Sequence, residues 1–253
     1  MKKAALKLIP ALCMLLISAM MLGTTTYAWF SMNTTVTATG MNVTAKSDNK
    51  FLQIVQHGDT FVDSSAQNTV TAAVVSAALK PTTTATAISS ASITAITSAA
   101  DASDILWAET FSNSPDSSAK GADKIYTAVT AAASAGTDYT LLNSFDIRLN
   151  PTGDVTSASL KVNNVTIAHD AGNNDAMLAA VRVLVVCGDE WSLWSYSGVL
   201  MATASGNVLG SVTDTPVTVH VYIFFDGEDS ATTTNNAADL GTDGYDVEVV
   251  FGV

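Results

Sequence analysis

The chain has 253 residues, of which 48% are hydrophobic and only 13% are charged, and its formal net charge is −12. This acidic balance disfavours nucleic acids and anionic lipid surfaces as partners, because both are bound through clusters of Lys and Arg. Cations and other proteins remain as partners that the charge allows.

The first 28 residues have the layout of a secretory signal peptide, with three early lysines, an apolar region over 8–22 and a short polar stretch over 23–28. We expect an N-terminal signal helix that is cleaved after Ala28, so that the mature chain begins at Trp29. The apolar region spans about 22 Å as a helix, short of the roughly 30 Å hydrocarbon layer, which argues against a retained anchor. The sequence therefore predicts a secreted protein that contacts the membrane only before cleavage.

Alternating apolar residues predict the first strand of the mature chain at Thr34–Ala45, where the period of two slips at Gly40 and indicates a bulge or bend. Phe51–Val55 is predicted as a second short strand, which Thr60–Asp63 continues beyond a turn at residues 57–59. Together these elements open a single predicted domain, 29–253.

Residues 64–124 form an insertion and loop that is rich in Ala, Thr and Ser. Ala72–Lys80 fits a weak helix, whereas Thr82–Thr97 has the β-branched content of an edge strand or of an ordered loop, and the sequence leaves these two open. Residues 112–124 combine Ser, Asn, Pro, Asp and Gly, which predicts a surface loop.

The remaining predicted strands are short and are separated by turn residues. They are Tyr139–Asn150, Ser157–His169, Ala176–Cys187, Val217–Phe225 and Tyr245–Phe251. Arg182 interrupts a nearly continuous apolar run, so we expect its side chain to face an edge or a carboxylate, and we expect Trp191 and Trp194 at a turn. The absence of a βαβ rhythm predicts an all-β fold: an antiparallel, jelly-roll-like β-sandwich with short helical or loop insertions.

Few residues suggest chemistry. The three histidines are scattered, and the sequence contains no nucleophile elbow, phosphate-binding loop or zinc-protease motif, so we expect no enzymatic activity. The densest carboxylates are Asp226, Glu228 and Asp229, whose hard oxygens suit calcium. Acidic turns between strands are usually only solvated, so the expectation is no cofactor, with calcium at this loop as the alternative.

The junction Tyr27–Ser31, followed by Ala38–Ala45, resembles the start of the TasA/camelysin family of Gram-positive surface proteins. In that family an Ala-aromatic-Phe cleavage site precedes a strand with a small-small-Gly-apolar pattern. Ala180–Val183 and segments between Val219 and Val249 are similar to later strands of related clostridial proteins. The resemblance implies a jelly-roll subunit that is cleaved by a signal peptidase of the SipW type and polymerises into biofilm-matrix fibres by donor-strand exchange.

The resemblance further implies that the freed N-terminal strand, residues 29–45, is the part that assembles. The residues that it assigns to the donor strand are Trp29, Phe30, Val36, Ala38, Gly40, Met41, Val43 and Ala45. Two alternatives remain open. Residues 29–45 pair within their own subunit, or the protein is a carbohydrate-binding or adhesin module that does not polymerise and stacks sugars on Trp107, Trp191, Trp194 or Tyr196.

Overall fold

The computed structural model describes residues 36–47, 52–62, 67–72, 75–98, 100–111, 125–130, 139–169, 177–232 and 245–253. All of them belong to the unit Thr35–Val253. The predicted signal peptide, its cleavage site at Ala28 and the aromatic pair Trp29 and Phe30 lie outside the described residues. The described elements are strands and two single-turn 3-10 helices, η1 (Ala102–Asp104) and η3 (Leu178–Ala180), which confirms the all-β prediction. Neither of these helices has the length or the apolarity of a membrane span.

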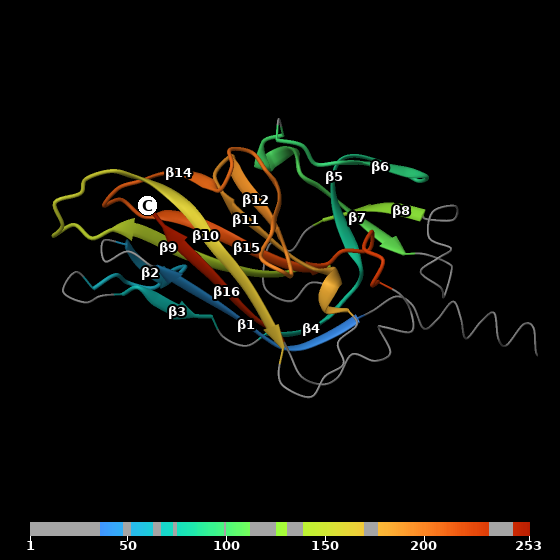
Figure 1. The fold of residues 1–253 in the computed structure, drawn as a ribbon, viewed down its shortest axis with the longest axis horizontal. Helices are drawn as coiled ribbons and strands as arrows, with labels where there is room; N and C mark the ends of the chain where they lie inside the picture. Colours follow the sequence, from blue (N-terminus) through green and yellow to red (C-terminus); the bar gives the residue numbers. More distant parts are fainter. Residues whose placement is uncertain are drawn as a thin grey trace, which may run out of the picture. The chain divides into compact units, whose positions relative to one another are not determined.

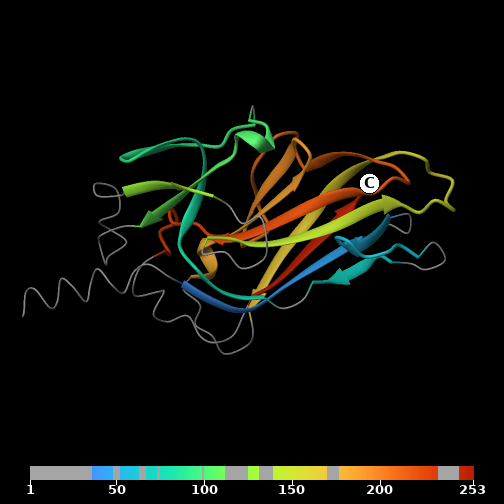
Figure 2. The ribbon, with the colours of Figure 1, turned by 180° about the vertical axis from the view of Figure 1, so that it is seen from behind.

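The first sheet contains both the first and the last described strand. Its order is β14 (Val208–Val212), β10 (Ala158–His169), β16 (Tyr245–Gly252), β1 (Val36–Ser47) and β3 (Thr69–Thr71), with β4 (Val75–Leu79) also paired to β1. Figures 1 and 2 both show β1, in blue, alongside β16, in red.

The second sheet is antiparallel throughout its described pairs. Its order is β13 (Leu200–Thr203), β12 (Glu190–Ser195), β11 (Val181–Cys187), β15 (Val217–Phe225), β9 (Leu141–Leu149) and β2 (Leu52–Gln56). Alternate residues of β15, among them Val219, Val221 and Ile223, are fully buried in the larger hydrophobic cluster, to which the first sheet also contributes Val165 and Val249. The cluster therefore fills the space between two sheets, as in a β-sandwich.

A third, smaller sheet covers part of the outer face of the second. Its order is β6 (Ser92–Ala95), β5 (Thr82–Ser89), β7 (Leu106–Phe111) and β8 (Ile125–Val129). Trp107 of β7 packs edge-on against Phe224 of β15, with ring centroids 5.1 Å apart. This contact belongs to a second hydrophobic cluster, separate from the core of the sandwich. The Ala/Thr/Ser-rich insertion thus supplies a sheet of its own.

Several predicted elements differ from those observed. Ala72–Lys80 is not a weak helix: it contains β4, because backbone pairing to β1 and burial of Leu79 outweigh the helix propensity of its alanines. Thr82–Thr97 is a hairpin of β5 and β6. Residues 60–62, predicted as strand, have no regular structure, and the predicted loop over 112–124 lies outside the described residues.

The purely antiparallel arrangement is also wrong, because β1 and β16 run parallel. A tight turn imposes an antiparallel pair, but these two strands are joined through the whole intervening chain, which leaves either direction open. The bulge predicted at Gly40 is confirmed, since the register of β1 against β4 shifts between Ala38 and Met41.

Candidate functional site

The strand predicted to take part in assembly, β1, is hydrogen-bonded along both edges over its C-terminal half. On one side Val43 and Ala45 are in register with Val247 and Val249 of β16, in parallel. On the other side Ala45 is in register with Val70 of β3, antiparallel. Both Val43 and Ala45 are 0% exposed and belong to the core of the sandwich. This half of β1 is therefore an integral part of the sheet and of its core.

The N-terminal half of β1 pairs with β4 through Val36, Ala38 and Met41, before and after the bulge at Gly40. The structure thus places all six predicted donor-strand residues that it describes on one continuous strand. They are Val36, Ala38, Gly40, Met41, Val43 and Ala45.

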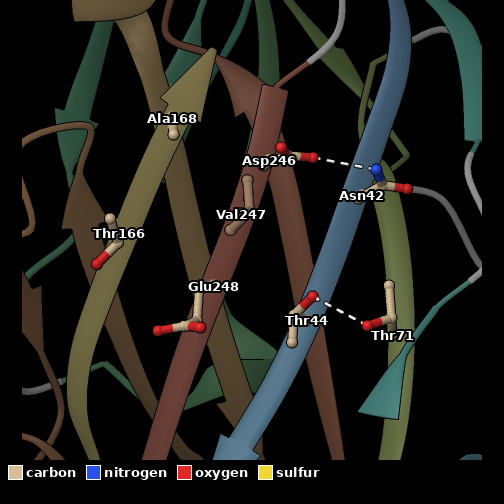
Figure 3. A pocket seen from close by; sticks show the side chains of 8 residues that line it. All are labelled: Asn42, Thr44, Thr71, Thr166, Ala168, Asp246, Val247 and Glu248. Atoms are coloured by element: carbon tan, nitrogen blue, oxygen red, sulfur yellow. Dashed lines mark hydrogen bonds between the residues drawn. The ribbon is translucent and has the colours of Figure 1, made fainter. Parts of the chain in front are cut away.

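Polar side chains tie the outer surface of β1 to its neighbours (Figure 3). The amide of Asn42 donates to Oδ1 of Asp246 at 3.0 Å, and the hydroxyls of Thr44 and Thr71 lie 3.2 Å apart. These residues line a shallow depression of about 390 Å³, together with Thr166, Ala168, Val247 and Glu248. We call the complete environment of β1, formed by β16, β3 and β4, the β1 seat.

No protein-family model, curated protein or solved structure matches this chain. The likeness to the TasA/camelysin family therefore stays a prediction that rests on its short sequence motifs.

The acidic loop after β15 surrounds an arginine. Nη2 of Arg182 donates to Oδ2 of Asp229 at 2.6 Å, and its Nε lies 3.4 Å from Oδ2 of Asp226. Two backbone carbonyls, of Ala179 and Val181, accept from Nη1. The carboxylate predicted beside Arg182 is confirmed. Burial raises the pKa of Asp226, and the nearby Arg182 opposes that shift without cancelling it.

The third carboxylate of the predicted calcium loop faces the small sheet. Glu228 accepts a hydrogen bond from the hydroxyl of Thr110 at 3.2 Å. Burial and the charge of Glu228 raise the pKa of Tyr126 to about 12. Among the described residues, no group of three His, Cys, Asp or Glu side chains is placed to hold a metal ion. The described contacts of Asp226, Glu228 and Asp229 are thus with an arginine and with hydroxyl and backbone groups.

This loop also joins the small sheet to the second sheet. The backbone N–H of Gly227 donates to the carbonyl of Thr82 at 3.0 Å, beside a single bridge between Thr82 and Asp226. A Cβ at position 227 would collide with the side chain and the carbonyl of Thr110, so only glycine fits. In the sequence, the only sign of this contact between the two sheets is the charge of Arg182 within an apolar run.

The tryptophans proposed as sugar-stacking platforms are buried. Trp191 and Trp194 lie within β12 and not at a turn, because their rings complete the two hydrophobic clusters. The indole of Trp191 donates to the carbonyl of Ala100, and that of Trp194 donates to the hydroxyl of Ser192. With Trp107 also buried, Tyr196 is the one exposed ring among these four. Burial therefore removes the three tryptophans as surface platforms.

Two of the scattered histidines lie close together on the outer face of the second sheet. Nδ1 of His57 is 2.8 Å from Oδ1 of Asp146, and Nδ1 of His220 is 2.8 Å from the hydroxyl of Ser144. Thr218 also donates to Asp146. Because Asp146 contacts His57 and the hydroxyl of Ser144 contacts His220, these contacts do not form a Ser-His-Asp relay. The sequence did not reveal this group, since its members come from the turn after β2 and from the strands β9 and β15.

His220 gives the stability of the protein a pH dependence. Burial lowers its pKa below the ordinary 6.5, the charge of His57 lowers it further, and Asp146 opposes both. The unfolded chain therefore takes up a proton more readily, and the free energy of unfolding should fall as the pH drops below about 6.5. In urea unfolding at about pH 7.5 and about pH 5.5, the difference between the two values should be smaller in His220→Gln than in the wild type.

Asp146 does not interfere with this measurement. Its pKa is lowered, by hydrogen bonds from His57, Thr218 and Gly58 against an opposing effect of burial, so its contribution is lost only as the pH falls through a value below 3.8. As a second readout, His57→Gln should move the pKa of His220, followed by NMR, upward. An unchanged pH dependence in His220→Gln would show that this histidine is not the cause.

Proposed function

We propose that this chain is an exported structural subunit that assembles with copies of itself into extracellular fibres or a surface layer, by exchange of the strand that contains β1. The observation that carries the proposal is the position of β1. It is the first described strand, it follows the predicted cleavage site, and its C-terminal half is paired along both edges in the middle of a sheet. The proposal includes cleavage after Ala28 by a signal peptidase of the SipW type and involves no catalysis by the chain itself.

Exchange of β1 requires little rearrangement. Because β1 comes first in the unit, it can leave its seat without unthreading another strand, and residues 48–51 are its sole covalent link to β2. A neighbouring subunit's β1 would restore the same ladder, the same burial of Val43 and Ala45, and the same bond between Asn42 and Asp246. Exchange of an identical element is a low-cost route to association, because the contacts that are lost are regained.

Head-to-tail exchange produces an open chain of subunits. Each copy gives one strand and receives one, so the contact does not close on itself and filaments result. A seat without its strand would expose the unpaired edge of β16 and the apolar positions around Val247 and Val249, which is a strong template for another strand.

A disulfide between the strand and its seat tests the exchange. The hydroxyls of Thr44 and Thr71 are 3.2 Å apart across the β1–β3 pair. In a Cys187→Ser background, the chain from Trp29 with Thr44→Cys and Thr71→Cys should form covalent ladders on a non-reducing gel under conditions where electron microscopy shows filaments. Each link of the ladder would join two copies, because the two cysteines of a pair would come from different subunits.

The matched control uses a pair that exchange leaves within one chain. Ser157 and Ser211 lie 3.1 Å apart where β10 and β14 meet, and Ser157→Cys with Ser211→Cys should give only internally bridged monomers. Deletion of residues 29–45 should abolish the filaments. Exchange would be disproved if the Thr44→Cys, Thr71→Cys variant forms filaments but runs as a monomer on the non-reducing gel. Assembly would be disproved if the wild-type chain forms no filaments.

A further inference from the structure

One edge of the second sheet combines an end strand with exposed apolar side chains. β13 is the last strand of that sheet and pairs with β12 alone among the described strands. Met201, within β13, is 49% exposed. Tyr196 and Val199, which precede β13 in the chain, are 39% and 59% exposed. The opposite edge differs, since the N–H of Ile54 in β2 donates to the carbonyl of Gln67. Within the part of the chain that the structure describes, one edge of the sheet is thus covered, and the β13 edge presents unpaired backbone beside apolar side chains.

Most of the devices that usually prevent edge-to-edge pairing are missing from β13. Natural edges carry Lys, Pro, a bulge that twists the strand away, or an inward-pointing charge. β13 reads Leu-Met-Ala-Thr, and no charged residue and no proline occurs anywhere from Trp191 to Thr213. β13 does carry a bulge, because Ala202 and Leu200 oppose the consecutive residues Leu193 and Trp194 of β12, which leaves Met201 as the extra residue.

The turn that leads into β13 is held in place. Gly198 has φ of +74°, and a Cβ on it would lie 2.6 Å from the carbonyl oxygen of Val165 in β10, so the turn lies directly on the first sheet. The hydroxyl of Ser195 accepts from the N–H of Val199, and the carbonyl of Ser195 accepts from the N–H of Gly198. A strand that is already fixed loses little further entropy when a partner pairs with it.

We propose that β13 pairs antiparallel with β13 of a second copy of this chain, which joins two second sheets across a two-fold axis. The charge of the protein favours a second copy of the chain as the partner of β13. With a net charge of −12, two copies repel each other over most of their surface, and the uncharged stretch from Trp191 to Thr213 is a region where they approach without like charges in contact. Met201 and Val199 of both copies bury each other beside the new backbone ladder.

This contact is independent of strand exchange. A two-fold contact uses the same patch on both copies and closes at a dimer, whereas exchange of β1 is head-to-tail and open-ended. If both occur, the dimer contact links filaments side by side. The two assemblies are therefore distinguishable by size.

Sedimentation velocity tests the dimer. The chain from Trp29, cleared of filaments by pelleting, should show a monomer–dimer equilibrium that strengthens as added salt screens the acidic charge. Met201→Lys places two like charges at the centre of the contact and should raise the dissociation constant roughly tenfold or more. Val199→Lys should act in the same direction.

Val62→Lys is the matched control. Val62 is 48% exposed and lies outside the β13 edge, and the substitution changes the net charge by the same amount, so it should leave the dissociation constant within about twofold. Because all three positions are well exposed, circular dichroism should show unchanged folding. A wild-type chain that stays monomeric, a species larger than a dimer in the cleared solution, or equal weakening by Val62→Lys would each overturn the proposal, whether or not filaments form.

Discussion

Replacing Arg182 by Met should lower the free energy of unfolding by about 3–5 kcal/mol. The guanidinium lies beside the carboxylates of Asp226 and Asp229, and its side chain is 6% exposed. Without it, two poorly solvated negative charges are left close together with no cation between them. The pKa of Asp226 is already raised by burial, so this carboxylate has little solvation to compensate the loss.

Two companion variants test whether unpaired buried charge causes the loss of stability in Arg182→Met. Arg148→Met makes the same change at a strand position where the guanidinium bonds to Gln53 and lies over the ring of Phe61, and it should cost about 1 kcal/mol or less. Adding Asp226→Asn and Asp229→Asn to Arg182→Met should restore much of the lost stability, because the buried charges disappear while an acceptor oxygen remains at each position. Equal losses in Arg182→Met and Arg148→Met, measured by chemical denaturation at neutral pH, would rule out the buried-charge explanation.

Trp191→Ala should have an effect of similar size, about 3–5 kcal/mol, because it removes the largest fully buried side chain among the described residues and leaves a cavity. The ring belongs to the cluster in which Trp107 packs on Phe224, and its indole nitrogen is bonded to the carbonyl of Ala100. The substitution therefore weakens the attachment of the small sheet as well as the second sheet itself.

Tyr196→Ala is the natural comparison, since this ring is exposed and lies five positions further along the same hairpin. Its cost should stay within about 0.5 kcal/mol. Guanidinium denaturation of both variants also tests the carbohydrate-binding alternative. A Trp191 that served as a surface platform for sugars could be removed without loss of stability, so a small effect of Trp191→Ala would favour that alternative over a structural role.

The parts of the fold that the sequence revealed are those in which a pattern reports burial directly. Strict alternation in Val217–Phe225 placed Val219, Val221 and Ile223 on the core side of β15, because the side chains of a strand point to alternate faces. Arg182 inside an apolar run indicated a carboxylate, because a buried cation needs a partner. The slip at Gly40 indicated the bulge in β1.

The parts of the fold that the sequence did not reveal depend on contacts between residues that lie far apart in the chain. Ala72–Lys80 has weak local preferences, and only its pairing with β1 makes it a strand. The parallel pairing of β1 with β16 has no local signature. The same holds for His57 and His220, which approach Asp146 and Ser144 only after β2, β9 and β15 have assembled.

The parallel pair of β1 and β16 also affects the timing of folding. Asn42 and its partner Asp246 are 204 positions apart, so one neighbour of β1 is synthesised long after β1 itself. At roughly 5–20 residues per second, β1 waits on the order of 10–40 s before β16 exists. During that interval β3 and β4 can already pair with one edge of β1, while its other edge has no partner within its own chain. Such a long-range contact closes slowly, and a chain truncated before β16 would keep that edge open permanently.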